Sequence, residues 1–217
     1  MQDSPYAENA KRLVPGFTHL QRMAELLLAE RVKDDGRVLV VGAGGGQELK
    51  LLAESHPAWR FDGIDPSSEM LDVAKVTLGP LTSQVDFHEG YIDAAPIGPF
   101  DGASCLLTLH FVPKDERLRT LQEIYRRLAP GAPLVVAHHS FPQGEDDKLL
   151  WLNRYAAFAI ASGVPESNAQ DAISAISERL PTLSPEKDEA LLAEAGFSNI
   201  QLFYAAFTFK GWVAYRS

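Results

Sequence analysis

The sequence predicts an α/β fold in which one sheet, mostly parallel, is covered by helices on both faces. Short apolar runs alternate with segments of helical periodicity along most of the chain. The runs are apolar at almost every position, as expected of strands that have no face in water. Two further runs near the C-terminal end follow one another without a helix between them, which favours an antiparallel hairpin at a sheet edge. Together these observations predict a doubly wound sheet that ends in this hairpin.

The elements follow in order along the chain. Residues 1–34 are expected to form a helical cover, because the break at Val14–Gly16 precedes a helical pattern from about Thr18. Strands are expected at Arg37–Val41, Arg60–Ile64, Ala103–Leu107, Pro133–Ala137, Asn199–Ala206 and Phe207–Tyr215, with another ending near Glu89–Ile92. Helices are expected at Glu48–Glu54, Ser67–Leu78, Arg117–Leu128 and from a cap at Ser184 to Gly196. A helical region within residues 143–183 interrupts the alternation and is expected to be a lid insertion.

Length and composition indicate one domain, residues 1–217, with 46% hydrophobic and 23% charged residues. The formal net charge of −9 has the wrong sign for a protein whose main partner is nucleic acid. No apolar run approaches the ~18 residues of a membrane span, and the first residues lack the apolar stretch of a secretory signal. The single cysteine, Cys105, excludes structural disulfides. A cytoplasmic protein without a membrane partner is therefore expected.

The sharpest motif is VLVVGAGGGQEL, in which Gly42 and Gly44–Gly46 lie between a predicted strand and a predicted helix. Glycine allows a tight turn and close approach to a ligand, and the next helix offers free amides to a negative group. Asp65 ends the second strand 19 residues after Gly46 (65 − 46), where a carboxylate can accept both ribose hydroxyls. An adenosine-containing ligand is predicted. The alternatives are a turn without a ligand and, for Asp65, a helix cap before Ser67.

A dinucleotide-binding loop has a third glycine three residues after Gly44, where this chain has Gln47. From Arg37 to Ala137 the sequence instead resembles the class I S-adenosylmethionine (SAM)-dependent methyltransferases. The segments EGYI, FDGASCLLTLHFV and RRLAPGAPLVVAH resemble that family, and so does the final hairpin. The resemblance implies a Rossmann-like sheet of seven strands, SAM as the cofactor and methyl transfer as the reaction.

Within that family the chain most resembles the synthases of carboxy-SAM used in wobble-uridine modification of transfer RNA, and their uncharacterised methyltransferase relatives. The segment RLVPGF at Arg12–Phe17 carries part of this likeness. The resemblance implies nine cofactor contacts: Phe17, Gly42, Ala43, Gly44, Asp65, Pro66, Tyr91, Ile92 and Leu106. Three polar positions of the family pattern are changed, to Val40, Tyr91 and Leu106. Neighbouring Asp93 or Glu89 could supply a lost polar contact.

The carboxy-SAM branch holds the extra carboxylate with an arginine, and the matching position here is Ile173. An apolar residue cannot pair a carboxylate, so ordinary SAM is expected, with Arg179 as the only nearby substitute for the alternative. Two other functions stay open. One is a carboxy-SAM synthase-like enzyme, and the other is a SAM-binding module without catalysis, which the changed polar positions favour.

Methyl transfer from a sulfonium is a direct displacement, so a base is needed only when the acceptor must lose a proton. His110 follows the fourth strand and His139 ends the fifth, which makes both candidate catalytic bases, while packing roles are the alternative. His138 and His139 should point to opposite faces of the sheet. The nearby acids form no recognised ligand spacing, so no metal is expected.

The acceptor is expected to be a small molecule with an apolar body. Trp151, Tyr155 and Phe158 share one helix face, which either packs in the core or lines a small acceptor site. The aromatic residues of the last two strands are expected to form core and a candidate homodimer surface.

Overall fold

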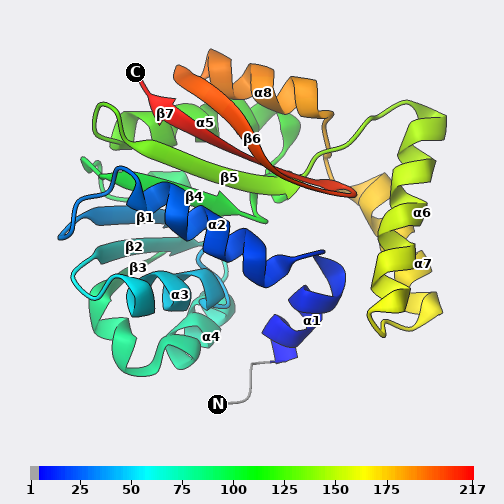
Figure 1. Cartoon of the computed structure of the whole chain (residues 1–217), viewed down its shortest axis with the longest axis horizontal. Helices are drawn as coiled ribbons and strands as arrows, with labels where there is room; N and C mark the ends of the chain where they lie inside the picture. The colour runs from blue at the N-terminus through cyan, green and yellow to red at the C-terminus, as the bar shows by residue number, and fades with distance from the viewer. Residues whose placement is uncertain (1–4) are drawn as a thin grey trace.

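The computed structural model describes the backbone of residues 5–217 and the side chains of residues 8–217. Its seven strands form one sheet in the order β3-β2-β1-β4-β5-β7-β6, parallel except at β5–β7 and β7–β6 (Figure 1). The strands are β1 Arg37–Val41, β2 Arg60–Asp65, β3 Val85–Glu89, β4 Gly102–Leu106, β5 Pro133–His139, β6 Phe197–Ala206 and β7 Phe209–Arg216. The predicted α/β fold with an antiparallel final hairpin is confirmed.

Helices cover both faces of the sheet. They are α1 Pro5–Leu13, α2 Phe17–Ala29, α3 Gln47–Ser55, α4 Ser68–Leu78, α5 Lys114–Arg127, α6 Glu145–Ala161, α7 Glu166–Arg179 and α8 Pro185–Glu194. Side chains of α2, α3 and α4 share one buried cluster with Val38 and Val40 of β1. Side chains of α5 and α8 share the other with Leu39 and Val41. Successive β1 residues therefore enter opposite cores, which explains why the strand is apolar throughout.

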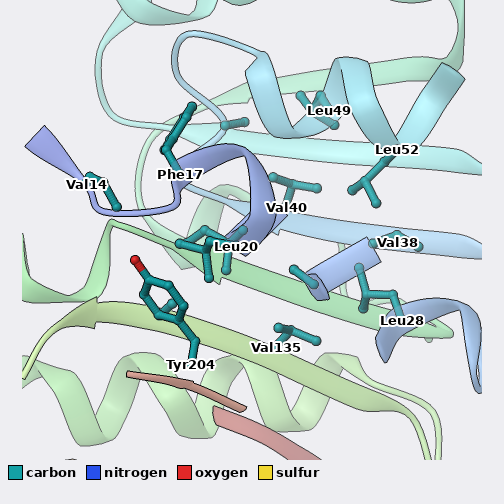
Figure 2. Packing of buried hydrophobic residues seen from close by; sticks show 14 of the residues in the cluster. Val14, Phe17, Leu20, Leu28, Val38, Val40, Leu49, Leu52, Val135 and Tyr204 are labelled. Carbon is teal, nitrogen blue, oxygen red and sulfur yellow. The ribbon is translucent and has the colours of Figure 1, made fainter. Parts of the chain in front are cut away.

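Helix α2 packs directly on the centre of the sheet. Figure 2 shows Leu20 and Leu28 lying over Val40 and Val38, and Phe17 at the end of α2 nearest the start of α3. The hydroxyl of Tyr204 donates a hydrogen bond to the carbonyl of Pro15 in the turn before α2. Residues 5–29 therefore form two helices tied to the body, while residues 1–4 of the expected cover lie outside the described part.

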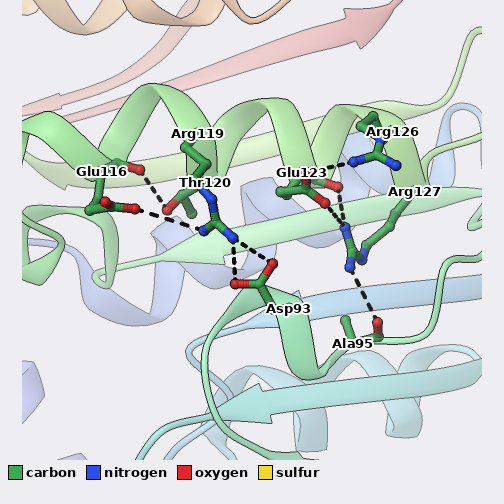
Figure 3. A network of polar contacts seen from close by, with 8 residues as sticks. All are labelled: Asp93, Ala95, Glu116, Arg119, Thr120, Glu123, Arg126 and Arg127. Carbon is green, nitrogen blue, oxygen red and sulfur yellow. Dashed lines mark hydrogen bonds and ion pairs between the residues drawn. The ribbon is translucent and has the colours of Figure 1, made fainter.

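The link between β3 and β4 contains only a short 3₁₀ turn, Ile92–Ala94, instead of a full helix. Figure 3 shows how this turn is fastened to α5: Arg119 Nη2 donates to both Asp93 oxygens at 2.7 Å. Arg127 donates to the Ala95 carbonyl at 3.4 Å, and Glu123 pairs with Arg127. The segment that carries Tyr91 and Ile92 is thus linked to α5 by one ion pair and one backbone hydrogen bond.

Two local expectations are corrected. Ser184 stands at the N-cap of α8, but its side chain makes no capping hydrogen bond to the helix. The strand expected at Phe207–Tyr215 begins instead at Phe209, because Phe207 and Thr208 form the β6–β7 turn. Phe207 has φ +49°, Thr208 is fully buried, and the Thr208 carbonyl accepts the Ser140 amide at 2.8 Å. Strand and helix limits otherwise shift by one to three residues.

Helices α6 and α7 occupy most of residues 143–183 and stand as a pair at one end of the sheet, next to the β6–β7 turn (Figure 1). Leu13 of α1 packs against Ala156 and Ala159 of α6. Within residues 5–217, no helix combines the length and the apolar character required to cross a membrane.

Candidate functional site

A cavity of about 360 Å³ opens at the carboxyl ends of β1, β2 and β4. In a parallel doubly wound sheet this is the edge at which ligands bind, because β1 lies where the strand order reverses. All nine residues that the family resemblance marked as cofactor contacts line it: Phe17, Gly42, Ala43, Gly44, Asp65, Pro66, Tyr91, Ile92 and Leu106. The fold therefore gathers into one cavity residues spread over 90 positions of the sequence (Phe17 to Leu106).

The glycine loop is built at contact distance from its neighbours. Gly42 has φ +83°, and a Cβ there would lie 1.9 Å from Thr108 Oγ1, beyond the end of β4. Gly46 has φ +70°, and a Cβ there would lie 2.8 Å from the backbone of Ala74 in α4. Neither position tolerates a side chain, because backbone strain and steric overlap act together. The glycines thus bring β1, β4 and α4 together at the cavity wall.

Asp65 fixes the loop through its carboxylate. Its Oδ2 accepts the Gly44 amide at 3.0 Å and its Oδ1 accepts the Ser67 amide at 2.9 Å. A Cβ on Gly44 would lie 2.6 Å from Asp65 Oδ2 and 2.8 Å from Met70 Cβ. Position 44 therefore requires glycine because a side chain there would displace the Asp65 carboxylate. Each carboxylate oxygen has a second lone pair, so Asp65 can still accept two ligand hydroxyls.

Aromatic side chains form the mouth of the cavity. Tyr91 is 71% exposed and Phe111 is 63% exposed, although both line the cavity. Such rings offer flat faces on which a planar base can stack. The suggested substitutes for the lost polar contacts do not take part, because Asp93 is paired with Arg119 and the exposed Glu89 does not line the cavity.

Sequence reasoning missed Glu48, which lines the cavity from the first turn of α3. Its Oε1 is buried and makes no hydrogen bond, and the neighbouring Ser104 Oγ on β4 is likewise without one. Burial raises the pKa of Glu48 to about 7, and the Ser104 hydroxyl lowers it in part. An acid directly after a glycine loop was the available signal, but a first-turn acid is usual in any helix.

The histidines lie in a buried cluster outside the cavity lining. The His139 amide donates to His110 Nδ1 at 3.2 Å, and His139 Nδ1 lies 3.0 Å from Thr208 Oγ1. Burial and neighbouring histidines hold the pKa of His110 well below its usual value, and burial lowers that of His139 to about 3. His138 points to the other face, with Nε2 3.2 Å from Asp188. Catalysis by His110 and His139 stays a prediction.

The aromatic face of α6 packs on the final hairpin. Tyr155 is buried edge-on to His139, Phe158 meets Phe207, and Trp151 stacks under the ammonium of Lys210. None of the three lines the cavity. Among residues 8–217, no group of three or more acids, histidines or cysteines could hold a metal ion.

Comparisons with known proteins agree with this geometry. A methyltransferase domain model matches residues 38–131. The carboxy-SAM synthase of Chromohalobacter salexigens is 25% identical over 97% of this chain and 80% of its own length. These findings support a SAM-dependent methyltransferase related to the carboxy-SAM synthase branch, as the sequence predicts.

Solved structures of this family share the fold. A SAM-dependent methyltransferase from Aquifex aeolicus superposes with a TM-score of 0.65 at 18% identity, covering 99% of this chain and 95% of that one. The methyltransferase SibL in its apo form gives a TM-score of 0.61 at 20% identity, over 93% of this chain. This chain spans 57% of the SibL chain. At such identities the likeness concerns the fold alone.

Proposed function

We propose that this chain transfers the methyl group of SAM to a small-molecule acceptor. The observation that carries the proposal is the single cavity lined by all nine cofactor positions, with Asp65 at the end of β2. The glycine contacts and the free lone pairs of Asp65 fit an adenosine ligand. SAM supplies an activated methyl group when it is bound there, and the chain's own part is to hold and orient it.

We place the adenosine half of SAM against the residues at the carboxyl ends of β2, β3 and β4. Asp65 would accept the ribose hydroxyls, and Ile92 and Leu106 would enclose the base, with the exposed ring of Tyr91 at its edge. The ion pair between Asp93 and Arg119 links the turn after Ile92 to α5. Recognition of the base therefore relies on packing more than on a charged side chain.

Direct displacement needs alignment before it needs a base. His110 and His139 remain proposed proton acceptors for an acceptor that must be deprotonated, but their lowered pKa values keep both rings neutral and weakly basic at pH 7. An acceptor whose reacting atom already has a free lone pair, such as an unprotonated amine, suits this site better. The net charge of −9 further favours a small molecule over a phosphate backbone.

Ordinary SAM is the proposed cofactor, and carboxy-SAM the alternative. Ile173 on α7 is partly buried among apolar residues such as Leu13. Arg179, the only nearby substitute cation, is exposed at the end of α7 and does not line the cavity. Neither position favours an extra carboxylate on the ligand.

Two further points complete the proposal. We propose a cytoplasmic location, because the single cysteine is buried and unpaired, as is usual in reducing compartments. We also propose a homodimer through the edge strand β6, where Leu202 is 53% exposed. Light scattering during gel filtration tests the dimer, and a monomer at every concentration would contradict it.

The test of function begins with the ligand. Mass spectrometry of purified protein should detect SAM or S-adenosylhomocysteine, and titration calorimetry should show that S-adenosylhomocysteine binds. A mixture of candidate amines, carboxylic acids and phenols with isotopically labelled SAM then identifies the acceptor by transfer of label. Failure to bind any adenosine ligand would overturn the proposed function.

A further inference from the structure

The cavity has an unbalanced charge. Among the described residues that line it, Asp65 and Glu48 are acidic and none is a lysine, arginine or histidine. The charge of Asp65 is shared with two backbone amides at 3.0 and 2.9 Å. Glu48 Oε1 is buried without a hydrogen bond. Glu48 is therefore the acid whose charge the protein leaves uncompensated.

A buried carboxylate without a partner is unfavourable unless it takes up a proton or meets a cation. Ser104 is the polar neighbour of Glu48 within the protein, and a hydroxyl carries no positive charge. The cavity lining that comes from β1 and α2 includes Val40, Leu20 and Gln21, which are apolar or neutral. When Glu48 is ionised, a positive group that pairs with it would come from the ligand.

The position of Glu48 indicates which positive group of the ligand would pair with it. Glu48 belongs to the first turn of α3, whose free amides favour a negative ligand group at the same place. An α-amino acid carries a carboxylate and an ammonium on one carbon, so one helix turn can meet both. We propose that Glu48 is the counter-ion for the ammonium of the ligand's amino-acid portion. This inference rests on the proposed function, because it takes SAM or its product as the ligand.

The pH dependence of this contact can be assigned to Glu48. The other titratable groups that line the cavity are Asp65 and Tyr91, toward the adenosine side. Cys105 follows Ser104 on β4, and burial raises its pKa to about 12, so the thiol stays neutral. Helix α2 contributes Phe17, Leu20 and Gln21, none of which titrates. The pKa of Glu48, raised to about 7 by burial, places a change of its charge near neutral pH.

The test compares two ligands by calorimetry on the full chain. S-adenosylhomocysteine carries the amino-acid portion, and 5′-methylthioadenosine lacks it. Glu48→Gln should lower the affinity for S-adenosylhomocysteine at least tenfold at pH 8. The affinity of the same variant for methylthioadenosine should stay within twofold of the wild-type value. The wild-type affinity for S-adenosylhomocysteine should fall about tenfold from pH 8 to pH 6, as a group with pKa near 7 loses its charge. Glu69→Gln, an exposed first-turn acid of α4, is the matched control.

The role of Glu48 is tested by comparing the two ligands in the wild type and in Glu48→Gln. Selective loss of S-adenosylhomocysteine in Glu48→Gln, together with a flat pH profile in that variant, supports the proposal. Equal binding by wild type and Glu48→Gln overturns it. Equal weakening of both ligands also overturns it, because Glu48 would then act on the shape of the cavity. Wild-type protein that binds neither ligand overturns the proposed function and, with it, this inference.

Discussion

Two carboxyl groups in one cavity behave differently because their surroundings differ. Asp65 accepts two backbone amides, so it is held in one orientation as an acceptor. The Oε1 of Glu48 is buried near the Ser104 hydroxyl, and desolvation raises the pKa of Glu48 to about 7. The two carboxyl groups therefore differ mainly in the number of backbone amides that donate to them.

Asp65→Ala should weaken S-adenosylhomocysteine binding by roughly 2 to 4 kcal/mol, because two charge-assisted hydrogen bonds of ~1.5–3 kcal/mol each are lost with incomplete additivity. Titration calorimetry measures the change. Asp65→Asn keeps one acceptor oxygen for the Gly44 amide. Its affinity for S-adenosylhomocysteine should lie between those of the wild type and Asp65→Ala. An affinity that does not change in either variant would remove Asp65 from the ligand site.

Glu48→Gln should stabilise the ligand-free protein at pH 8. The pKa of Glu48 rises from 4.5 to about 7, so the folded state holds the proton more tightly than the unfolded chain. The penalty is absent below about pH 4.5, grows as pH rises and is complete above pH 7, at roughly 2 to 4 kcal/mol. Urea unfolding of both proteins should differ at pH 8 and coincide at pH 4. An equal difference at both pH values would contradict a charge effect.

At the scale of elements, the cavity depends on close approach between pieces that are distant in sequence. Gly46 lets the start of α3 touch the backbone of Ala74 in α4, and Gly42 lets β1 end against Thr108. The N-terminal helices contribute Phe17 to the cavity and are linked through Leu13 to α6. Ligand binding at Phe17 can therefore restrain α1 and, through it, α6, although α6 does not contact the ligand.

SAM should slow hydrogen exchange in residues 6–17 and 151–163. Phe17 lines the cavity, and α1 packs on α6, so ordering the first segment restrains the second. Helix α8, on the opposite face of the sheet, is the internal control and should not change. Exchange mass spectrometry with and without SAM measures this. Unchanged exchange in both segments would refute the lid expected at residues 143–183.

At the scale of the molecule, the same fold serves enzymes that handle different forms of SAM. The relatives named carboxy-SAM synthase share 25% identity or close to it with this chain. The described cavity holds two acids and no cation, and α7 presents Ile173 to an apolar cluster. The balance of charge in the cavity favours a cationic ligand over one that carries an added carboxylate.

Incubation with SAM and prephenate should therefore yield no carboxy-SAM. A carboxylate on the sulfonium side would lie in a cavity that offers it no lysine or arginine among the described residues. Liquid chromatography with mass spectrometry detects the product, and the Chromohalobacter salexigens relative assayed in parallel shows that the conditions permit it. Carboxy-SAM formed by this chain would reverse the choice of cofactor.

The sequence by itself predicted the order of elements, because apolar periodicity and glycine spacing are local properties that act through backbone geometry. Its resemblance to a known family supplied the nine proposed cofactor positions. It did not reveal Glu48, the pairing of Asp93 with Arg119 or the neutral state of His139. Each of these depends on how much water and which donors surround a side chain after distant segments meet. Desolvation and ion pairing are properties of the assembled cavity, so only the tertiary structure decided them.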